Sequence, residues 1–316
     1  MRIFVAGATG ALGKRLVPML VERGHDVTGT TRRPHEAKFA LIRELGATPV
    51  AADGLNPEAV AEAVASAEPE VVVHQLTALS SIDLRKFEQS FALTNRLRTE
   101  GIDHLLSAAR AVGAKRFVAQ SFAGWPYARD GAAAKPEDSP LDASPPAPMR
   151  TTHAAIRHLE AAVTGAEWTE GIALRYGGFY GPGTSIALHP DGEMVETIRA
   201  RKLPLVGDGA GVWSFIHIDD AAAATVAAIE HGTRGVYNIV DDAPAPVAEC
   251  IPALAAAVGA KPPRRVPRWL ARLLAGEAAV VMMTEVRGAL NGKAKRELGW
   301  RPDYPTWREG FANGLG

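Results

Sequence analysis

Three regularly spaced glycines stand near the start of the chain, in the segment Gly7-Ala8-Thr9-Gly10-Ala11-Leu12-Gly13. The segment lies between a predicted strand at residues 2–6 and a predicted helix at residues 11–23. In such a turn the first glycine permits a tight bend, the second lets the backbone approach a pyrophosphate, and the third allows the helix to pack on the strand. The helix start also directs free N–H groups and a positive dipole end at the phosphates. The segment, with Thr9, Ala11 and Leu12 between its glycines, therefore predicts a dinucleotide site; the alternative is a purely structural turn.

Two neighbouring arginines follow the second predicted strand, in Thr30-Thr31-Arg32-Arg33-Pro34. A site for NAD usually has Asp or Glu here, which accepts a hydrogen bond from the ribose 2′-hydroxyl, whereas a site for NADP has cations beside the 2′-phosphate. A carboxylate would repel that phosphate, and a guanidinium matches it with two hydrogen bonds. Arg32 and Arg33 therefore favour NADP(H), with NAD(H) as the other cofactor; the structural alternative is a solvated loop.

The composition excludes several classes of protein. The 316 residues include 35 Lys and Arg and 35 Asp and Glu, so the net charge is zero, whereas a nucleic-acid binder needs excess positive charge. The balance also argues against a polybasic membrane anchor, and no stretch approaches the roughly 18–20 apolar residues of a transmembrane helix. The single cysteine, Cys250, excludes internal disulfides and cysteine-rich zinc sites. Since the N-terminus also lacks a signal-peptide pattern, we expect a cytoplasmic protein with neither a nucleic acid nor a membrane as partner.

The first half of the chain alternates short strands with amphipathic helices. Strands are predicted at residues 2–6, 27–31, 48–52, 71–75 and 116–119, and helices at 11–23, 35–45, 57–66 and 87–112. This order predicts an α/β fold of the Rossmann type, with a doubly wound parallel sheet and right-handed crossovers.

A smaller lobe is predicted to follow, because glycine and proline become frequent after residue 177. We expect an NADP-binding domain at 1–176, to which 219–241 returns, and a smaller C-terminal substrate-binding lobe at 177–218 and 242–316. Five prolines between 136 and 148 predict an extended loop after the fifth strand. That loop lies near the carboxyl edge of the sheet, where open α/β sheets bind ligands.

In this order the segments resemble an extended, atypical short-chain dehydrogenase/reductase of the NAD(P)-dependent epimerase/dehydratase-like family. The resemblance covers essentially the whole chain. It rests on residues 7–13, 53–55, 175–183, 215–220 and 297–302, together with Asn95 and Ser121.

The resemblance implies further contacts with the cofactor and a mode of assembly. The implied contacts are Asp53, Gly54 and Leu55 at the adenine, Leu76 and Thr77 along the cofactor, and Tyr176, Gly178 and Phe179 beside the nicotinamide. For Asp53 the alternative is a turn residue before the next helix. The resemblance also implies a homodimer formed through the long helix and the helix at 152–164.

The usual catalytic pair of this family is missing. Members that transfer hydride usually carry Tyr-x-x-x-Lys on the helix after the loop, where the tyrosine exchanges a proton and the lysine lowers its pKa and holds the ribose. Alignment of this helix by Glu160 puts Thr152 at the tyrosine position and Ile156 at the lysine position, and no Tyr-x-x-x-Lys occurs in the chain. Isoleucine can neither hold a ribose hydroxyl nor perturb a phenol electrostatically.

Four residues are candidates for the missing proton chemistry. Ser121 after the fifth strand can bind a substrate oxygen or relay a proton, and Tyr127 on the next loop either reaches the substrate or forms a pocket wall. Thr152 and His153 begin the helix where the tyrosine would stand; imidazole is a general acid near neutral pH, and a surface histidine is the alternative. His217 is interpreted as structural or pocket-lining, and no metal-ligand cluster is found.

These observations predict an NADPH-dependent oxidoreductase that reduces a carbonyl of a small organic substrate by an atypical proton route. The alternatives are a cofactor-retaining epimerase or dehydratase, against which the missing pair counts, and a non-catalytic NADP(H)-binding sensor or scaffold. Loss of the tyrosine is tolerable because the cofactor supplies the hydride, while a substrate phenol or a water can supply the proton. Five aromatic residues either line a pocket for a flat molecule or belong to the core: Phe122, Trp125, Phe179, Tyr180 and Trp213.

Overall fold

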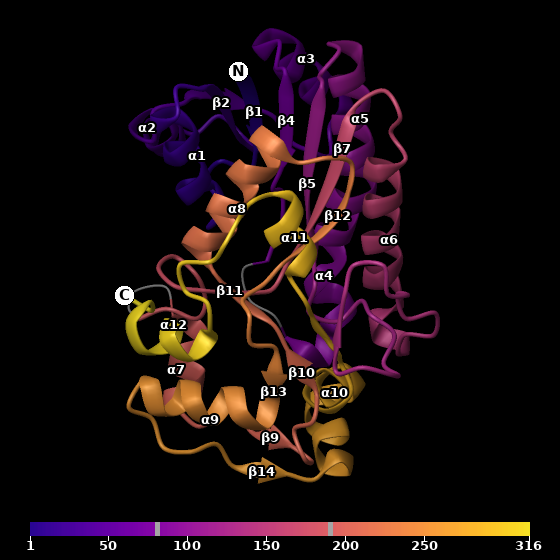
Figure 1. Ribbon diagram of the computed structural model, residues 1–316, viewed down its shortest axis with the longest axis vertical. Helices are drawn as coiled ribbons and strands as arrows, with labels where there is room; N and C mark the ends of the chain where they lie inside the picture. Colours follow the sequence, from indigo (N-terminus) through magenta and orange to yellow (C-terminus); the bar gives the residue numbers. More distant parts are fainter. Residues whose placement is uncertain (80–82, 189–191) are drawn as a thin grey trace.

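A seven-stranded parallel sheet forms the centre of the protein in a computed structural model, which describes residues 1–79, 83–188 and 192–316 (Figure 1). The strand order is β12-β7-β5-β4-β1-β2-β3, and each strand runs parallel to its neighbours. The strands are β1 (Arg2–Ala6), β2 (Asp26–Thr31), β3 (Thr48–Ala51), β4 (Val71–His74), β5 (Arg116–Phe122), β7 (Glu170–Tyr176) and β12 (Gly235–Ile239). The predicted Rossmann-type, doubly wound fold is confirmed.

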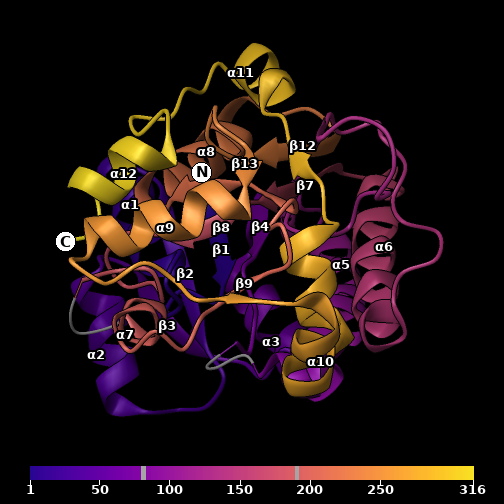
Figure 2. The ribbon, with the colours of Figure 1, turned by 90° about the horizontal axis from the view of Figure 1, so that it is seen from below.

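Helices cover both faces of this sheet (Figure 2). One face carries α1 (Gly13–Glu22), α2 (Glu36–Glu44) and α8 (Ile218–His231), and the other carries α3 (Pro57–Ala67), α5 (Ile102–Ala111) and α6 (Arg150–Thr164). Because successive strand residues point to opposite faces, Val5 belongs to the apolar cluster that contains Leu16 of α1, while Phe4 belongs to the cluster on the other face, with Val64 of α3. A strand that is covered on both faces must be apolar throughout, and this explains the unbroken apolar runs of β1 and β4.

The strand order reverses between β1 and β4. From β1 the chain continues through β2 to β3 on one side, and then returns to β4 and proceeds outward on the other. At such a switch point the loops after the two strands diverge and leave a crevice for a ligand. The glycine turn follows β1, and Leu76 and Thr77 follow β4, so these residues flank the switch point.

The long helix predicted at 87–112 is interrupted. It consists of α4 (Phe87–Arg96), a π-helical turn (Leu97–Gly101) and α5. The hydroxyl of Thr99 donates a hydrogen bond to the carbonyl oxygen of Asn95 (3.1 Å). Back-bonding of this kind competes with the regular backbone ladder, and π-turns of this type occur frequently at functional sites.

The remaining elements are mostly short. They are β6 (Ala134–Lys135), β8 (Gly178–Tyr180), α7 (Glu193–Arg199), β9 (Leu205–Val206), β10 (Val212–Trp213), β11 (Phe215–His217), β13 (Ala245–Pro246), α9 (Val247–Ala257), β14 (Arg265–Val266), α10 (Arg268–Thr284), β15 (Gly288–Ala289), α11 (Gly292–Glu297) and α12 (Trp307–Asn313). Figure 1 shows α7, α9, α10 and α12 below the carboxyl edge of the sheet, whereas α11 lies beside β12. Tyr180, Trp307 and Phe311 belong to an apolar core of their own. Cys250 of α9 is buried in the same core, and burial raises the pKa of its thiol to about 12.

The C-terminal segment is attached to the sheet domain through one buried carboxylate. The two oxygens of Asp220, in α8, accept hydrogen bonds from the backbone N–H groups of Asp303 (2.7 Å) and Tyr304 (3.0 Å). The indole N–H of Trp300 donates to the carbonyl oxygen of Asp220 (3.1 Å). The neighbouring Asp219 is instead half exposed and pairs with Arg15 (3.0 Å). Substitution of each of these adjacent aspartates therefore compares the contribution of a buried carboxylate to stability with that of a half-exposed one.

We expect Asp220→Ala to lower the free energy of unfolding by about 2–4 kcal/mol, because two buried N–H groups lose their acceptor. Asp219→Ala should cost less than about 1 kcal/mol, since it removes a half-exposed ion pair with Arg15 and a longer contact with His217 (3.7 Å). Urea denaturation monitored by circular dichroism measures both values. Equal losses in the two variants would show that the carboxylate of Asp220 does not hold the C-terminal segment.

Candidate active site

The glycine turn has the geometry that a bound pyrophosphate requires. Gly7 has a φ of +102°, and its N–H donates a hydrogen bond to the hydroxyl of Thr30 (3.1 Å). The N–H of Gly10 donates to the carbonyl oxygen of Gly7 (3.0 Å). A Cβ at Gly13 would lie 2.4 Å from the Gly7 carbonyl oxygen and 2.6 Å from that of Ala8. A Cβ at Gly10 would approach only the Gly7 oxygen, at 3.3 Å. Gly13 therefore serves the packing of α1 on β1, whereas the outer side of Gly10 faces away from the protein.

Arg32 and Arg33 lie directly after β2, and both are exposed. The preceding Thr31 is buried; its carbonyl oxygen accepts from the N–H of Ala52 (2.9 Å), and its hydroxyl has no hydrogen-bond partner among the described residues. The two arginines thus follow the strand that neighbours β1, after which the glycine turn stands. This is the place where a nicotinamide dinucleotide presents its adenosine ribose.

The loop after β3 and the segment after β4 approach each other. Asp53 accepts a hydrogen bond from the N–H of Leu55 (3.1 Å), so its carboxylate forms the turn that begins α3. A Cβ added at Gly54 would lie 2.6 Å from Cδ1 of Leu76, so this glycine lets the two segments pack closely. Thr77 is exposed beside them. The proposed adenine contacts therefore lie together, although the carboxylate of Asp53 already serves a local turn.

The structure places Tyr176 in the interior of the sheet domain. Its hydroxyl accepts from the side-chain amide of Gln75 (3.2 Å) and lies 2.6 Å from the hydroxyl of Thr225 in α8. Burial raises the pKa of this phenol. The ring of Phe179 lies 5.4 Å from that of Tyr176, while Gly178 and Phe179 are only partly buried. Of the three residues proposed beside the nicotinamide, Gly178 and Phe179 are thus the accessible ones.

Two buried side chains occupy the positions of the missing catalytic pair. Thr152 accepts a hydrogen bond from the amide nitrogen of Asn95 in α4 (3.0 Å). The other atom of that amide, Oδ1, has no hydrogen-bond partner in the part of the chain that the structure describes. Ile156 lies one turn further along α6 and is fully buried. Threonine keeps a hydroxyl at this place, but its hydroxyl lacks the acidity of a phenol.

Ser121 belongs to a buried ion pair. Its hydroxyl donates to Oε1 of Glu160 in α6 (2.7 Å), and Arg175 of β7 binds the same carboxylate through Nε (2.7 Å) and Nη2 (2.6 Å). The side chains of Glu160 and Arg175 are 8% and 4% exposed. A bidentate pair that is this well shielded from solvent has a defined geometry. The Ser121 hydroxyl is therefore directed toward the helix and is engaged there.

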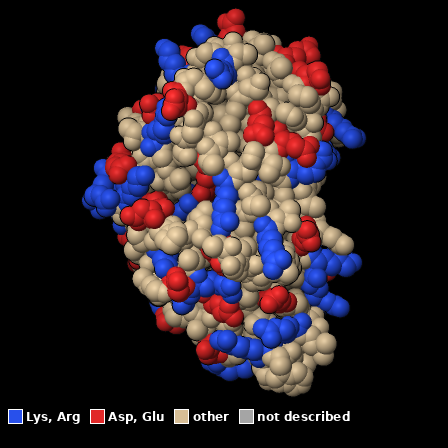
Figure 3. All heavy atoms as spheres, turned by 90° about the vertical axis from the view of Figure 1, so that its right-hand side faces the viewer, with Lys and Arg blue, Asp and Glu red and all other residues tan. Residues whose placement is uncertain are grey.

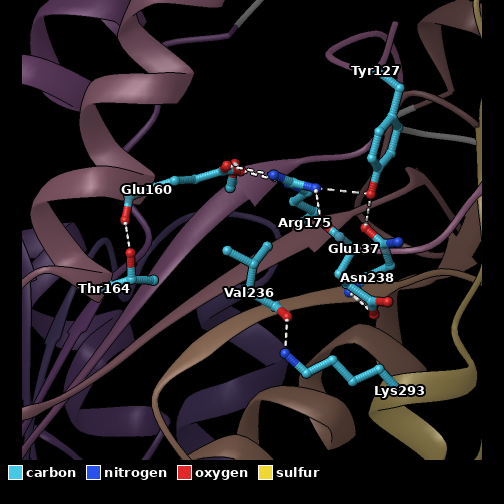
Figure 4. A network of polar contacts seen from close by, with 9 residues as sticks. Tyr127, Glu137, Glu160, Thr164, Arg175, Val236, Asn238 and Lys293 are labelled. Atoms are coloured by element: carbon cyan, nitrogen blue, oxygen red, sulfur yellow. Dashed lines mark hydrogen bonds and ion pairs between the residues drawn. The ribbon is translucent and has the colours of Figure 1, made fainter. Parts of the chain in front are cut away.

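Tyr127 extends the same network toward the proline-rich loop (Figure 4). Its hydroxyl accepts from Nη1 of Arg175 (2.9 Å) and donates to Oδ1 of Asn238 in β12 (2.6 Å). The backbone N–H of Asn238 donates to the carboxylate of Glu137 in the loop (2.9 Å). Burial raises the pKa of the Tyr127 phenol. Its hydrogen bonds indicate a phenol that fixes the loop rather than one that exchanges protons.

His153 is buried in α6, and neither ring nitrogen has a hydrogen-bond partner within the described ranges. Burial lowers its pKa to about 4, against the opposing influence of Asp142. The imidazole is therefore neutral at pH 7, and a neutral imidazole cannot act there as a cationic general acid. The interpretation of His153 as a surface histidine is wrong, because its side chain is buried.

The aromatic residues divide into separate groups. Trp125 packs against Phe87 (5.5 Å between ring centroids), Phe91 (5.4 Å) and Phe122 (4.4 Å), and Trp213 borders the same cluster. Tyr180, by contrast, lies in the core of the C-terminal elements. Of the five aromatic residues that the sequence suggested for a substrate pocket, Phe122, Trp125 and Trp213 thus lie together in one cluster near the end of β5.

Analysis of the sequence missed the partners that tie these residues together. Glu160 served only to align α6, and Asn238 was not singled out, because pairs distant in sequence leave no local pattern. Arg98 in the π-turn was missed as well; it is buried, and burial lowers its pKa to about 10, an effect that nearby Glu160 opposes. A buried arginine beside a glutamate could be suspected only once α4 and α6 are known to pack together.

Other kinds of site were also sought in the described part of the chain. There, no group of three or more His, Cys, Asp or Glu side chains is arranged to hold a metal ion. Nor does any helix of those residues combine the length and apolar character needed to cross a membrane.

A doubly wound sheet with a glycine turn at its switch point defines a dinucleotide-binding protein. Residues 3–240 match the model of the NAD dependent epimerase/dehydratase family, and the chain belongs to this family. Of solved structures, a UDP-glucose 4-epimerase with UDP-glucose from Thermotoga maritima superposes with a TM-score of 0.77 at 23% identity, covering 100% of this chain and 97% of the other. A human epimerase family protein with NADPH gives 0.75 at 22%, covering 100% and 99%. These two likenesses show the fold.

Two curated relatives that cover most of this chain are reductases. The chain is 46% identical over 317 residues to a 3-diazoavenalumate denitrifying reductase of a Streptomyces species, covering 98% of this chain and 99% of the relative. It is 30% identical to a 2-alkyl-3-oxoalkanoate reductase of Stenotrophomonas maltophilia, covering 82% and 76%. The protein is an oxidoreductase of this family that uses a nicotinamide cofactor and acts on a small molecule.

Two glycine substitutions separate packing from cofactor binding. We expect Gly13→Ala to lower the free energy of unfolding by about 1–3 kcal/mol, because its Cβ overlaps two carbonyl oxygens. Gly10→Ala should change stability by less than about 1 kcal/mol but weaken NADPH binding about tenfold or more, since the methyl group stands where a phosphate approaches. Urea denaturation and a fluorescence titration measure the two effects. Unchanged NADPH affinity in Gly10→Ala would contradict this division.

Substitutions in the network test whether its hydroxyl groups take part in the reaction. Ser121→Ala and Tyr127→Phe should each lower the free energy of unfolding by about 1–3 kcal/mol and leave kcat within about threefold, because both hydroxyls are held by structural partners. Tyr237→Phe is the matched control, as its buried hydroxyl bonds Thr233 and Glu297 away from this network. A large loss of kcat in Ser121→Ala or Tyr127→Phe alone would place that hydroxyl in the chemistry.

Proposed function

We propose that the protein is an NADPH-dependent reductase that removes a diazo group from an aromatic acid as dinitrogen. The observation that carries the proposal is the 46% identity, over nearly the full length of both chains, to a denitrifying reductase that acts on a diazo acid. The site supports it, because Thr152 and Ile156 stand where a carbonyl reductase of this family would need its tyrosine and lysine. A second support is the aromatic cluster around Trp125, which suits a flat substrate.

The proton balance of this reaction explains why a phenol is dispensable. When bound, NADPH supplies a hydride. An aryl diazonium cation that gains one hydride becomes an arene and N2: the C–N bond breaks, a C–H bond forms, and the charges cancel. No proton from the protein enters this balance. Where a neighbouring phenolate makes the substrate formally neutral, hydride transfer releases N2 and leaves the product as a phenolate, which takes a proton from water.

The residues of this chain then have binding and positioning roles. The turn at Gly10 and the start of α1 hold the pyrophosphate, and Arg32 and Arg33 bind the 2′-phosphate. Asn95 and Thr152 offer a neutral polar pair at the place of the missing acid. Neutral groups suit a cationic substrate, because an added positive charge there would repel it.

A carbonyl reductase is the second candidate. The observation that favours it is the 30% identity to a 2-alkyl-3-oxoalkanoate reductase over most of the chain. Reduction of a ketone to an alcohol needs one proton besides the hydride. Thr152 or a water bound to Asn95 would have to deliver that proton, since His153 is neutral and Tyr127 is engaged.

The two candidates predict different products. With a hydroxybenzenediazonium carboxylate labelled with nitrogen-15, we expect labelled N2 and NADP⁺ in equal amounts, measured by mass spectrometry and absorbance. With NADPH deuterated at the transferred position, deuterium should appear in the arene. A 3-oxo acid is the control substrate and should be turned over at least about a hundredfold less efficiently. Turnover of the oxo acid alone would support the second candidate and overturn the first.

The preference for NADP(H) depends on the two arginines after β2. Arg32→Ala and Arg33→Ala together should weaken NADPH binding about tenfold to a hundredfold and leave NADH binding within about threefold, because only NADPH carries the 2′-phosphate. Lys38→Ala, an exposed cation of α2 without the predicted contact, is the control. Tryptophan fluorescence titrations give the constants. Equal affinity of the parent for NADPH and NADH would contradict the assignment.

A further inference from the structure

The first half of α10 exposes large apolar side chains. Gly276 has φ 87° and ψ 172°, so it separates residues 268–275 from the rest of α10. In this first half Trp269, Leu273 and Leu274 are 67%, 74% and 57% exposed. An exposed apolar side chain lacks the stabilisation that burial would give it, so three such residues on two helical turns require an explanation.

The second half of the same helix is packed. Ala278 and Val281 lie in the aromatic cluster with Phe87 and Trp125. The indole N–H of Trp213 also donates to the carbonyl oxygen of Met282 (2.8 Å). The exposed residues therefore stand on a helical turn that is anchored in the protein, rather than on a frayed end.

Exposed cations accompany this face along the chain. Residues 261–276, called here the basic-apolar segment, contain Lys261, Arg264, Arg265, Arg268 and Arg272 and no Asp or Glu. All five are exposed. Arg268 pairs with Asp208 (3.2 Å), and the other four form no ion pair with any described residue. Figure 3 shows positive side chains near the lower end of the molecule, with some acidic side chains among them and an uncharged protrusion beside them.

The two kinds of side chain are arranged in rows. Arg268 and Arg272 are four residues apart and share one side of the helix, while Trp269 and Leu273 form the adjacent row. A helix with tryptophan and leucine beside arginine is typical of segments that lie in the interface of a membrane. Each cation near an anionic membrane surface adds to the attraction, and tryptophan favours the headgroup level.

We propose that the basic-apolar segment binds the surface of an anionic lipid bilayer, with Trp269, Leu273 and Leu274 in the headgroup boundary and the five cations against the lipid phosphates. A second copy of the chain is a poor occupant, because the two basic faces would repel each other. The proposal is independent of the proposed function. It departs from our expectation from the sequence that no membrane is a partner. That expectation rested on the net charge of the whole chain and on the absence of a membrane-spanning segment. Neither of these two criteria detects a local basic and apolar surface patch.

Vesicle binding tests the proposal with the full-length protein. In co-sedimentation, we expect binding to phosphatidylglycerol/phosphatidylcholine vesicles that is at least about tenfold stronger than to phosphatidylcholine alone and that weakens as salt rises. The tryptophan emission should shift to the blue on binding, and Trp269→Phe should abolish the shift. Binding to neither type of vesicle, or equal binding to both, would overturn the proposal.

Matched variants locate the binding surface. Arg264→Glu with Arg272→Glu should weaken binding to the anionic vesicles about thirtyfold or more, whereas Lys38→Glu with Arg110→Glu, the same charge change on other exposed cations, should have less than about a threefold effect. Leu273→Ser should weaken binding more than the control Leu290→Ser. Thermal unfolding verifies that each variant is folded. Equal effects of the two charge-reversal pairs would overturn the assignment to this segment, as would binding of polyglutamate or DNA in place of vesicles.

Discussion

One buried ion pair fixes the arrangement of the elements at the carboxyl edge of the central sheet. Glu160 and Arg175 join α6 to β7, and Ser121 of β5 and Tyr127 of the following loop attach to the same pair. Removing two charges from water is costly, and the pair is sustained only because its oxygens and N–H groups have partners on every side. The positions of the helix, two strands and a long loop are therefore coupled through a single set of hydrogen bonds.

This coupling clarifies how the chain departs from other members of its family. Thr152 and Ile156, which alignment by Glu160 puts at the expected tyrosine and lysine positions, are both buried, and Thr152 accepts a hydrogen bond from Asn95. The neighbouring histidine is neutral because it is buried. The side chains at positions 152, 153 and 156 of α6 are thus uncharged at pH 7.

The fold and the glycine turn could be predicted from sequence because their signals are local. The spacing of Gly7, Gly10 and Gly13 and the alternation of strands and helices each occupy a few consecutive residues. The roles of Ser121 and Tyr127 could not be predicted, since their partners Glu160 and Asn238 are distant in the chain. The π-turn also escaped prediction, because apolar periodicity continues smoothly through it. Burial of His153 depends on how the proline-rich loop covers α6, which composition does not reveal.

The state of Cys250 has a chemical consequence for an enzyme that handles diazonium groups. Such groups are electrophiles, and the thiolate form of cysteine is the nucleophile that would add to them. The only thiol of the chain is buried beneath α12, and its raised pKa keeps it protonated. Under the proposed function, the chain therefore offers a diazonium substrate no accessible thiolate to modify.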